Sequence, residues 1–307
     1  MITRSICLVL GAGASVPYGF PTGPGLLSKV SEELRKHSSP TAELLRGIGY
    51  SDKELEAFAE SLYFSGQPSV DAFLVKRPEY LKLGREAIVA TLIPCEELGE
   101  LRSRAGEQRW YQSLFQFLDA SPEDFDGNRL SVVTLNYDRS LEYFLLTALE
   151  HSYDLKEPEA AKALEAVPII HVYGQLGRPH FVNPEGRAYL PNVSSDMVKK
   201  YATEIAILQQ SRWSRCASDG LAQALPCIRR AGLVCFLGFG YHDANIDYLC
   251  LDELVDPKAC LLGSAYHLGD ARRKQVESRF HDRIELGGDQ EDVLTFLTGH
   301  DVLGCAF

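Results

Sequence analysis

The first apolar segment of the chain runs directly into a glycine-rich turn. Residues 6–10 read Ile-Cys-Leu-Val-Leu, without a polar side chain, which is typical of a parallel strand covered on both faces. Gly11 and Gly13 follow at once, and glycine permits close backbone approaches that other residues prevent. A helix is expected to begin near residues 25–27. Because a strand, a glycine turn and a helix N-terminus together present N–H groups to an anion, this segment predicts a nucleotide site.

Two other interpretations of this segment fit less well. A secretory signal needs a longer apolar run and more basic residues than Arg4, which alone precedes it. A dehydrogenase fingerprint needs a third glycine where the chain has Val16. It also needs an acid at the end of a second strand about 20 residues later, where the pattern here predicts helix. A generic dehydrogenase is therefore not expected.

Charge and cysteine usage exclude several classes of protein. The net charge of −11 disfavours a broad nucleic-acid surface, and no apolar run is as long as a membrane span. The eight cysteines form no C-x-x-C pair, which disfavours zinc, and several lie in apolar segments. We therefore expect a cytoplasmic protein with reduced cysteines, no metal, no membrane contact and no direct nucleic-acid contact.

The remaining pattern predicts one α/β domain over residues 1–307. Residues 41–120 look almost wholly helical, which predicts a helical insertion over 41–128. Pro168 lacks a ladder donor, so its strand should begin there or lie at an edge. A small hairpin is expected at 178–190. The further expected strands cover 130–135, 167–173, 233–238, 259–262 and 283–286, and the further helices 26–36, 139–149, 194–230, 245–254, 270–279 and 291–298.

Four of the predicted strands end in glycine-rich or polar loops. These loops read GAGAS at 11–15, TLNYD at 134–138, HVYG at 171–174 and GFGYHD at 238–243. Ligands of open parallel sheets bind at the carboxyl ends of the strands, where such loops converge. The four endings together therefore predict one site more strongly than any single glycine motif does.

The loop at 134–138 places Thr134, Asn136 and Asp138 on one side if the strand persists that far. Asn136 both donates and accepts hydrogen bonds, which suits it to hold ribose hydroxyls, an amide ring or a water. Asp138 begins the next helix, so a helix cap and a direct substrate contact are equally good interpretations.

Two histidines follow strands, and each has a structural alternative. His171 is either a satisfied core residue or a general base at a strand end. His242, with Asp243, is a second acid–base candidate. We prefer the interpretation in which that loop contacts the ligand through its backbone, while Asp243 or Asn245 caps the next helix. The other histidines have no distinctive context.

In their order and spacing, these motifs resemble those of sirtuin-like domains. The segment Ser-Val-Asp-Ala-Phe-Leu at 69–74 also resembles a short S-x-D-x-F-L motif of bacterial sirtuin-like proteins. The resemblance extends from Ile6 to the loop after Gly263. It implies a Rossmann-like parallel sheet, of the sirtuin/DHS-like NAD-binding type, with a large helical insertion after the first strand.

One departure from the family narrows the resemblance. Protein-deacylating sirtuins carry a structural zinc module with two C-x-x-C pairs, which this chain lacks. The bacterial antiphage sirtuin-like NAD hydrolases, which deplete cellular NAD, resemble this chain in both respects: they lack the zinc module and have a long helical block. The resemblance implies NAD as substrate, Asn136 and His171 as the catalytic pair, and Asp138 as a group that orients the ribose or that pair. It implies dinucleotide contacts from Gly11, Ala12, Gly13, Ser15, Pro21, Thr22, Asp71, Thr134, Gly238 and Gly240.

The residue types suit this chemistry. Cleavage of the nicotinamide–ribose bond passes through an oxocarbenium-like state, as other glycosyl transfers do. Nicotinamide leaves as a neutral molecule, so a strong general acid is not required. Asn136 is expected to position ribose and water, and His171 to accept the proton.

Other functions share the same pocket. One is an NAD-dependent deacylase or ADP-ribosyl transferase, and another is a regulatory subunit that binds NAD or ADP-ribose without turnover. Family members of this size resemble those encoded beside a HerA-type ATPase/helicase or an Argonaute-type protein. We therefore expect a homo-oligomer or a complex with such a partner.

Overall fold

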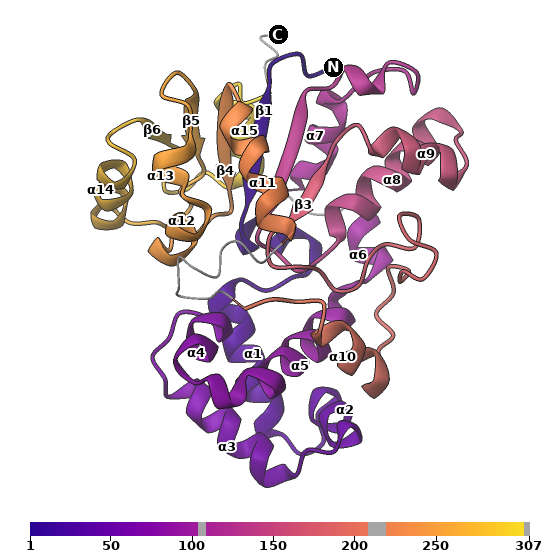
Figure 1. Ribbon diagram of the computed structural model, residues 1–307, viewed down its shortest axis with the longest axis vertical. Coiled ribbons are helices and arrows are strands. Elements are labelled where there is room, and N and C mark those ends of the chain that lie inside the picture. Colours follow the sequence, from indigo (N-terminus) through magenta and orange to yellow (C-terminus); the bar gives the residue numbers. More distant parts are fainter. Residues whose placement is uncertain (104–108, 208–218, 304–307) are drawn as a thin grey trace.

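A six-stranded sheet, parallel throughout, forms the centre of the protein (Figure 1). The computed structural model describes residues 1–103, 109–207 and 219–303. Helices flank the sheet, so the chain has an α/β fold that is consistent with a Rossmann-like architecture, as predicted. The strands are β1 Ile6–Leu10, β2 Leu130–Thr134, β3 Ile169–His171, β4 Leu233–Leu237, β5 Cys260–Gly263 and β6 Ile284–Leu286.

The strand order β3-β2-β1-β4-β5-β6 creates a switch point between β1 and β4. Along the chain, β2 and β3 are added on one side of β1. The chain then crosses to the opposite side of β1, where β4, β5 and β6 follow. Leu10, the last residue of β1, pairs with Thr134 of β2 and with Leu237 of β4. The three central strands therefore end at the same level, and the loops after them diverge from one edge of the sheet. Ligands of open α/β sheets bind at such a point.

Complete burial explains the composition of the central strands. Every residue of β1 and of β4 is buried, so neither strand has a face for a polar side chain. The helices beside the sheet are α6 Leu98–Arg102, α7 Trp110–Phe117, α8 Ser140–Tyr153, α9 Glu157–Leu164, α11 Asp219–Arg230, α12 Asp243–Leu249, α13 Leu251–Leu254, α14 Asp270–Arg279 and α15 Val293–Gly299.

Six helices form a separate layer beyond the carboxyl ends of the strands, which we call the helical lobe (Figure 1). Five of them follow β1, and the sixth, α10, comes from far along the chain and packs on α2 and α5. The described residues between β1 and β2 contain no strand, as predicted. The lobe nevertheless differs from the expected 41–128 unit, because α1 and α10 belong to it while α7 packs on α8 and α15. Its members are α1 Gly23–Arg35, α2 Pro40–Ile48, α3 Asp52–Tyr63, α4 Val70–Lys76, α5 Leu81–Leu92 and α10 Ser195–Ala202.

Two local predictions need correction. The expected hairpin at 178–190 does not form, and only an isolated bridge joins Pro179 to Arg187. The expected helix at 194–230 is interrupted, since 203–207 are not helical and 208–218 lie outside the described residues. The prediction for Pro168 is confirmed, because β3 is an edge strand that begins immediately after it.

The loop at 178–190 is held by a buried ion cluster and not by strand pairing. Arg139 donates from Nε and Nη2 to the two carboxylate oxygens of Glu96, at 3.0 and 2.6 Å, and Arg187 also donates to this carboxylate. Both Arg139 and Glu96 are completely buried. Arg139 reaches the carbonyls of Arg187 and Ala188 as well, at 2.8 and 3.1 Å. One guanidinium therefore joins the segment after α5, the start of α8 and this loop.

Two further findings concern the described residues. No disulfide joins the cysteines among them. A search of the described helices finds none that is both long and apolar enough to cross a membrane.

Candidate functional site

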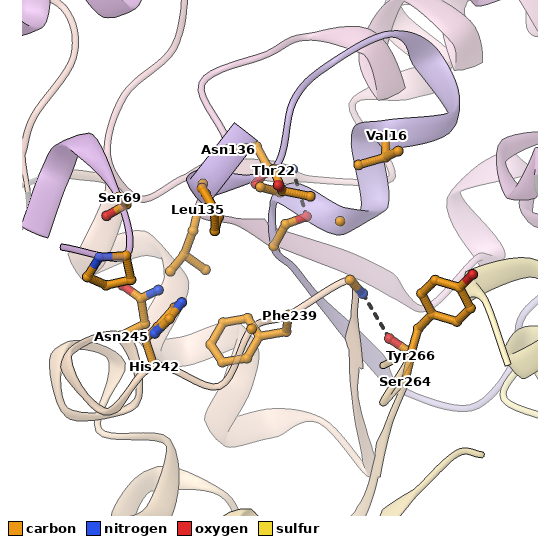
Figure 2. A pocket seen from close by; sticks show the side chains of 18 of the residues that line it. Val16, Thr22, Ser69, Leu135, Asn136, Phe239, His242, Asn245, Ser264 and Tyr266 are labelled. Atoms are coloured by element: carbon orange, nitrogen blue, oxygen red, sulfur yellow. Dashed lines mark hydrogen bonds between the residues drawn. The ribbon is translucent and has the colours of Figure 1, made fainter. Parts of the chain in front are cut away.

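A cavity of about 710 Å³ lies between the carboxyl ends of the strands and the helical lobe (Figure 2). The loops after β1, β2, β4 and β5 contribute to its wall, and Tyr173 contributes from beyond β3. The segments before α1, α4 and α15 complete the wall. Eight predicted site residues line it, namely Gly11, Ala12, Gly13, Thr22, Asp71, Asn136, Gly238 and Gly240. The remaining five, Ser15, Pro21, Thr134, Asp138 and His171, are outside the lining.

The glycines of the β1 and β4 loops pack directly on one another and form the floor of the cavity. The N–H of Gly11 donates to Leu237 O, and that of Gly13 to Gly238 O, each at 3.0 Å. A Cβ on Gly13 would lie 2.9 Å from the Cα of Gly238. These two N–H groups are therefore used within the protein, which corrects the prediction that they face a phosphate. Glycine is required here because the backbones of the β1 and β4 loops lie too close together to leave room for a side chain.

Asn136 is fixed above this floor by its own amide. Its Nδ2 donates to Gly11 O and to Ser15 Oγ, both at 3.0 Å, and its backbone N–H donates to Thr134 Oγ1 at 3.1 Å. The Gly11 carbonyl accepts only, so this contact assigns which amide atom is the nitrogen. Among the described residues no donor reaches Asn136 Oδ1. Ser15 and Thr134 thus hold Asn136 in place, and its oxygen remains available as an acceptor.

Asp138 does not reach the cavity. Its Oδ1 accepts from the backbone N–H of Ser140 at 3.1 Å and from the Ser140 hydroxyl. Burial raises the pKa of the Asp138 carboxyl, while these hydrogen bonds oppose the shift. Of its two sequence interpretations, this geometry supports the structural one at the start of α8.

His171 is also turned away from the cavity. Its Nδ1 lies 2.8 Å from Asn136 O and its Nε2 lies 2.5 Å from Glu142 Oε1, so each nitrogen faces an acceptor. Burial lowers the pKa of His171, but the Glu142 carboxylate, the Asn136 carbonyl and Asp138 together outweigh it, so the net pKa is above the ordinary value. The imidazolium then donates from both nitrogens. This placement corrects the prediction of a base that faces substrate, and gives His171 a role in holding the Asn136 backbone.

Tyrosines take the place expected for His171 on this side of the cavity. Tyr173 lines the wall and donates to Asn245 Oδ1 at 3.2 Å. Tyr137 donates to Asp71 Oδ1 at 2.6 Å, which joins the loop after β2 to the helical lobe. Burial raises the pKa of Asp71, although the bond from Tyr137 opposes this. Asp71 therefore presents one oxygen to Tyr137 within a wall of the cavity.

The β4 loop carries a second group of polar residues. Its glycines line the cavity, and Gly238 N–H donates to Ser264 Oγ at 2.9 Å. His242 is the N-cap residue of α12 and lines the cavity too. Burial, aided by Arg272, lowers the pKa of His242. Neither expected cap is present, because Asp243 and Asn245 both lie inside α12: Asp243 accepts from Arg272 at 3.4 Å, and Asn245 Oδ1 accepts from Tyr173.

The β5 loop is the part of the site that sequence reasoning missed. Ser264, Tyr266 and His267 line the cavity. The strand β5 was predicted, and like the other strands it is followed by a loop with small and polar residues. The rule applied to the four other strand endings would have found it. Asp292 is a further missed residue, and it caps α15 by accepting from Thr295 N–H at 2.8 Å.

The lining has no lysine or arginine side chain among the described residues. Its acidic and histidine side chains are Asp71, Asp243, Asp292, His242 and His267, and its tyrosines are Tyr137, Tyr173 and Tyr266. The N-terminal segments of α1, α4, α12 and α15 all contribute residues to the wall, and helix N-termini attract anions. In the described part of the chain, no cluster of histidine, cysteine and carboxylate side chains is suited to a metal ion. A phosphate here would be held by backbone groups and helix dipoles.

Comparisons with known proteins do not assign a family. No protein-family model matches the chain, and a search of curated proteins finds no matching sequence. The fold, the switch point and the cavity are therefore the observations from which function is inferred.

Proposed function

We propose that the cavity binds NAD and that the chain hydrolyses its nicotinamide–ribose bond to nicotinamide and ADP-ribose. The observation that carries the proposal is the position of the cavity, at the β1/β4 switch point of a β3-β2-β1-β4-β5-β6 sheet. Parallel sheets of this order bind dinucleotides at that place. Asn136, held at the same point with a free amide oxygen, supplies an acceptor for the reacting ribose.

The cavity suits such a ligand in size and in polarity. Its volume of about 710 Å³ is within the range of small-molecule sites. The two phosphates would be held at helix N-termini, and the longest helix that begins at the wall, α1, has 13 residues. Asn136 Oδ1 would orient a ribose hydroxyl or the attacking water. The carboxylate of Asp71 would lie near the positive charge that develops on the ribosyl group.

A second candidate is binding without turnover, in a regulatory subunit for NAD or ADP-ribose. The observation that favours it is the arrangement of His171, whose two nitrogens both face protein acceptors. A deacylase or ADP-ribosyl transferase would use the same pocket. We place the chain in the cytoplasm as an antiphage effector, either as a homo-oligomer or with a HerA-type ATPase/helicase or an Argonaute-type partner.

The test uses purified protein incubated with NAD, alone and with the product of a neighbouring gene. Nicotinamide and ADP-ribose are resolved by chromatography, an acetylated peptide is assayed in parallel, and ADP-ribose affinity is measured by calorimetry. The variants are Asn136→Ala and, as a matched control, Asn192→Ala, which removes an exposed asparagine outside the cavity.

Release of nicotinamide by wild type and Asn192→Ala, with loss in Asn136→Ala, supports the proposal. Binding of ADP-ribose without any release of nicotinamide supports the regulatory subunit instead. Deacylation of the peptide supports the deacylase. Neither binding nor release, with or without the neighbouring protein, refutes an NAD site.

A further inference from the structure

His242 is a cavity histidine whose ring is not engaged by the protein. It begins α12 and its side chain lies in the cavity (Figure 2). Among the described residues, neither of its ring nitrogens has a hydrogen-bond partner. His242 and the other histidine of the lining, His267, are both exposed residues, but His267 lies near a carboxylate, with its Nδ1 3.8 Å from Asp289. His171 has both nitrogens occupied.

The backbone beneath the His242 ring is held in place. Asn245 N–H donates to His242 O at 2.9 Å, and Tyr173 in turn donates to the side chain of Asn245 at 3.2 Å. A Cβ on Gly240 would lie 3.2 Å from His242 Nε2, so the glycine leaves room for the ring over the loop. The imidazole is therefore attached to a fixed backbone, and its nitrogens are free to meet a ligand.

The net effect of its surroundings favours the neutral form of His242, mainly because its ring is partly removed from water. Arg272, on α14, donates to Tyr241 O and to Asp243, so a guanidinium lies next to the loop that carries His242. Burial and Arg272 lower the pKa of His242, and Asp243 opposes them. Asp71 and Asp292 face the cavity from α4 and from the start of α15. A neutral imidazole at pH 7 is able to accept a proton.

We infer that His242 is the proton acceptor in the hydrolysis, an inference that rests on the proposed function. The bond between ribose C1′ and the nicotinamide nitrogen breaks, and its electron pair leaves with nicotinamide. A water oxygen forms the new bond to C1′, and its proton passes to a ring nitrogen of His242. ADP-ribose leaves, and the imidazolium returns its proton to solvent.

The experiment compares His242→Gln with His151→Gln, a matched control at an exposed position on α8. Nicotinamide release is measured against pH, ADP-ribose affinity by calorimetry, and the His242 ring is titrated by NMR. We expect His242→Gln to lower kcat by about 10²–10⁴-fold, the usual contribution of a general base. ADP-ribose affinity should change little. The acid limb of the wild-type kcat/KM profile should have an apparent pKa below the ordinary histidine value, should match the NMR titration, and should disappear in the variant.

The possible failures are distinguishable. If wild type and His242→Gln release nicotinamide at the same rate with the same pH profile, the role of His242 is overturned while NAD hydrolysis stands. If wild type binds ADP-ribose but releases no nicotinamide under any condition, hydrolysis is refuted and the proton acceptor with it. A loss of activity in His151→Gln equal to that in His242→Gln would also overturn the assignment.

Discussion

Substitutions in the glycine floor of the cavity are expected to destabilise the protein, because an added methyl group would clash with backbone atoms, which cannot rotate away as a side chain can. In Gly238→Ala the new Cβ would lie 2.0 Å from Ala14 N and 2.4 Å from the carbonyl carbon of Gly13. The φ of Gly238 is +57°, in the left-handed region, which costs a non-glycine residue about 1–2 kcal/mol. Overpacking adds about 1–3 kcal/mol. We expect a destabilisation of about 2–5 kcal/mol.

Two further substitutions separate the cost of the left-handed backbone from the cost of overpacking. Gly13→Ala places its Cβ 2.9 Å from Gly238 and has no left-handed φ, so only overpacking applies, about 1–3 kcal/mol. Gly99→Ala makes the same chemical change in α6, where no heavy atom lies within 4 Å of the new Cβ. Alanine is favoured over glycine inside helices, so this control should be neutral or up to about 1 kcal/mol more stable.

The assay is urea unfolding at 25 °C, with midpoints compared at an unchanged m-value. Calorimetry gives a second measurement, in which each 1 kcal/mol corresponds to about 1.5 °C in Tm for a chain of this length. We expect Gly99→Ala to be the most stable variant, Gly13→Ala to be intermediate and Gly238→Ala to be the least stable. A Gly238→Ala midpoint equal to that of Gly99→Ala would refute the reasoning, because it would mean that the two loops separate without cost.

Three other substitutions test the groups around the site. Glu96→Gln should lower stability by about 3–5 kcal/mol in urea unfolding, because two buried guanidinium groups lose their counter-charge. The pKa of His171 is raised in the native state, so its stabilising contribution is complete below about pH 6.5 and is lost as the pH rises through the native pKa. Unfolding across that window should show the loss in wild type, and Glu142→Gln should flatten the curve. Ser15→Ala should cost about 1 kcal/mol in stability yet lower kcat by about tenfold or more, because Asn136 loses one of its two amide partners.

Each of these has a contrary outcome. A Glu96→Gln midpoint within about 0.5 kcal/mol of wild type would contradict a buried charge cluster that needs its carboxylate. An identical pH dependence of stability in wild type and Glu142→Gln would contradict the proposed ion pair with His171. Unchanged kcat in Ser15→Ala would show that the Gly11 carbonyl alone orients the amide.

The sequence predicted the sheet well because its signals are local. The apolar runs that form β1, β2, β4 and β5 are short and bounded by glycine or polar residues, and each lies within one or two residues of the expected range. The same rule placed Asn136 at the cavity, since it needs only the end of β2.

Local signals could not predict that Tyr173 lines the cavity while His171 does not. It depends on where β3 ends, and β3 stops at His171, which pairs with Thr134 of β2. It also depends on Glu142, which α8 brings to the histidine from 29 residues earlier in the chain. Both facts are tertiary, so a motif that contains both residues does not say which one enters the cavity.

The missing hairpin has a similar cause. Turn residues at 178–190 indicate a reversal of the chain, and the reversal occurs, but the carbonyls of Arg187 and Ala188 accept from the buried Arg139. A side chain from the residue before α8 therefore supplies hydrogen bonds that a second strand would otherwise provide. No local pattern reports a partner that comes from so far away.

The place of α10 in the helical lobe has a consequence for synthesis of the chain. The hydroxyl of Ser195, at the start of α10, donates to Leu44 O at 2.8 Å, across 151 positions of sequence. Ribosomes release residues in order, so α2 and α5 emerge long before the helix that covers them. Until residue 202 is free, the nascent lobe exposes an apolar face that a chaperone can recognise. The lobe thus completes its folding late in translation, after β3 has been made, and truncations that end before α10 should yield aggregation-prone chains.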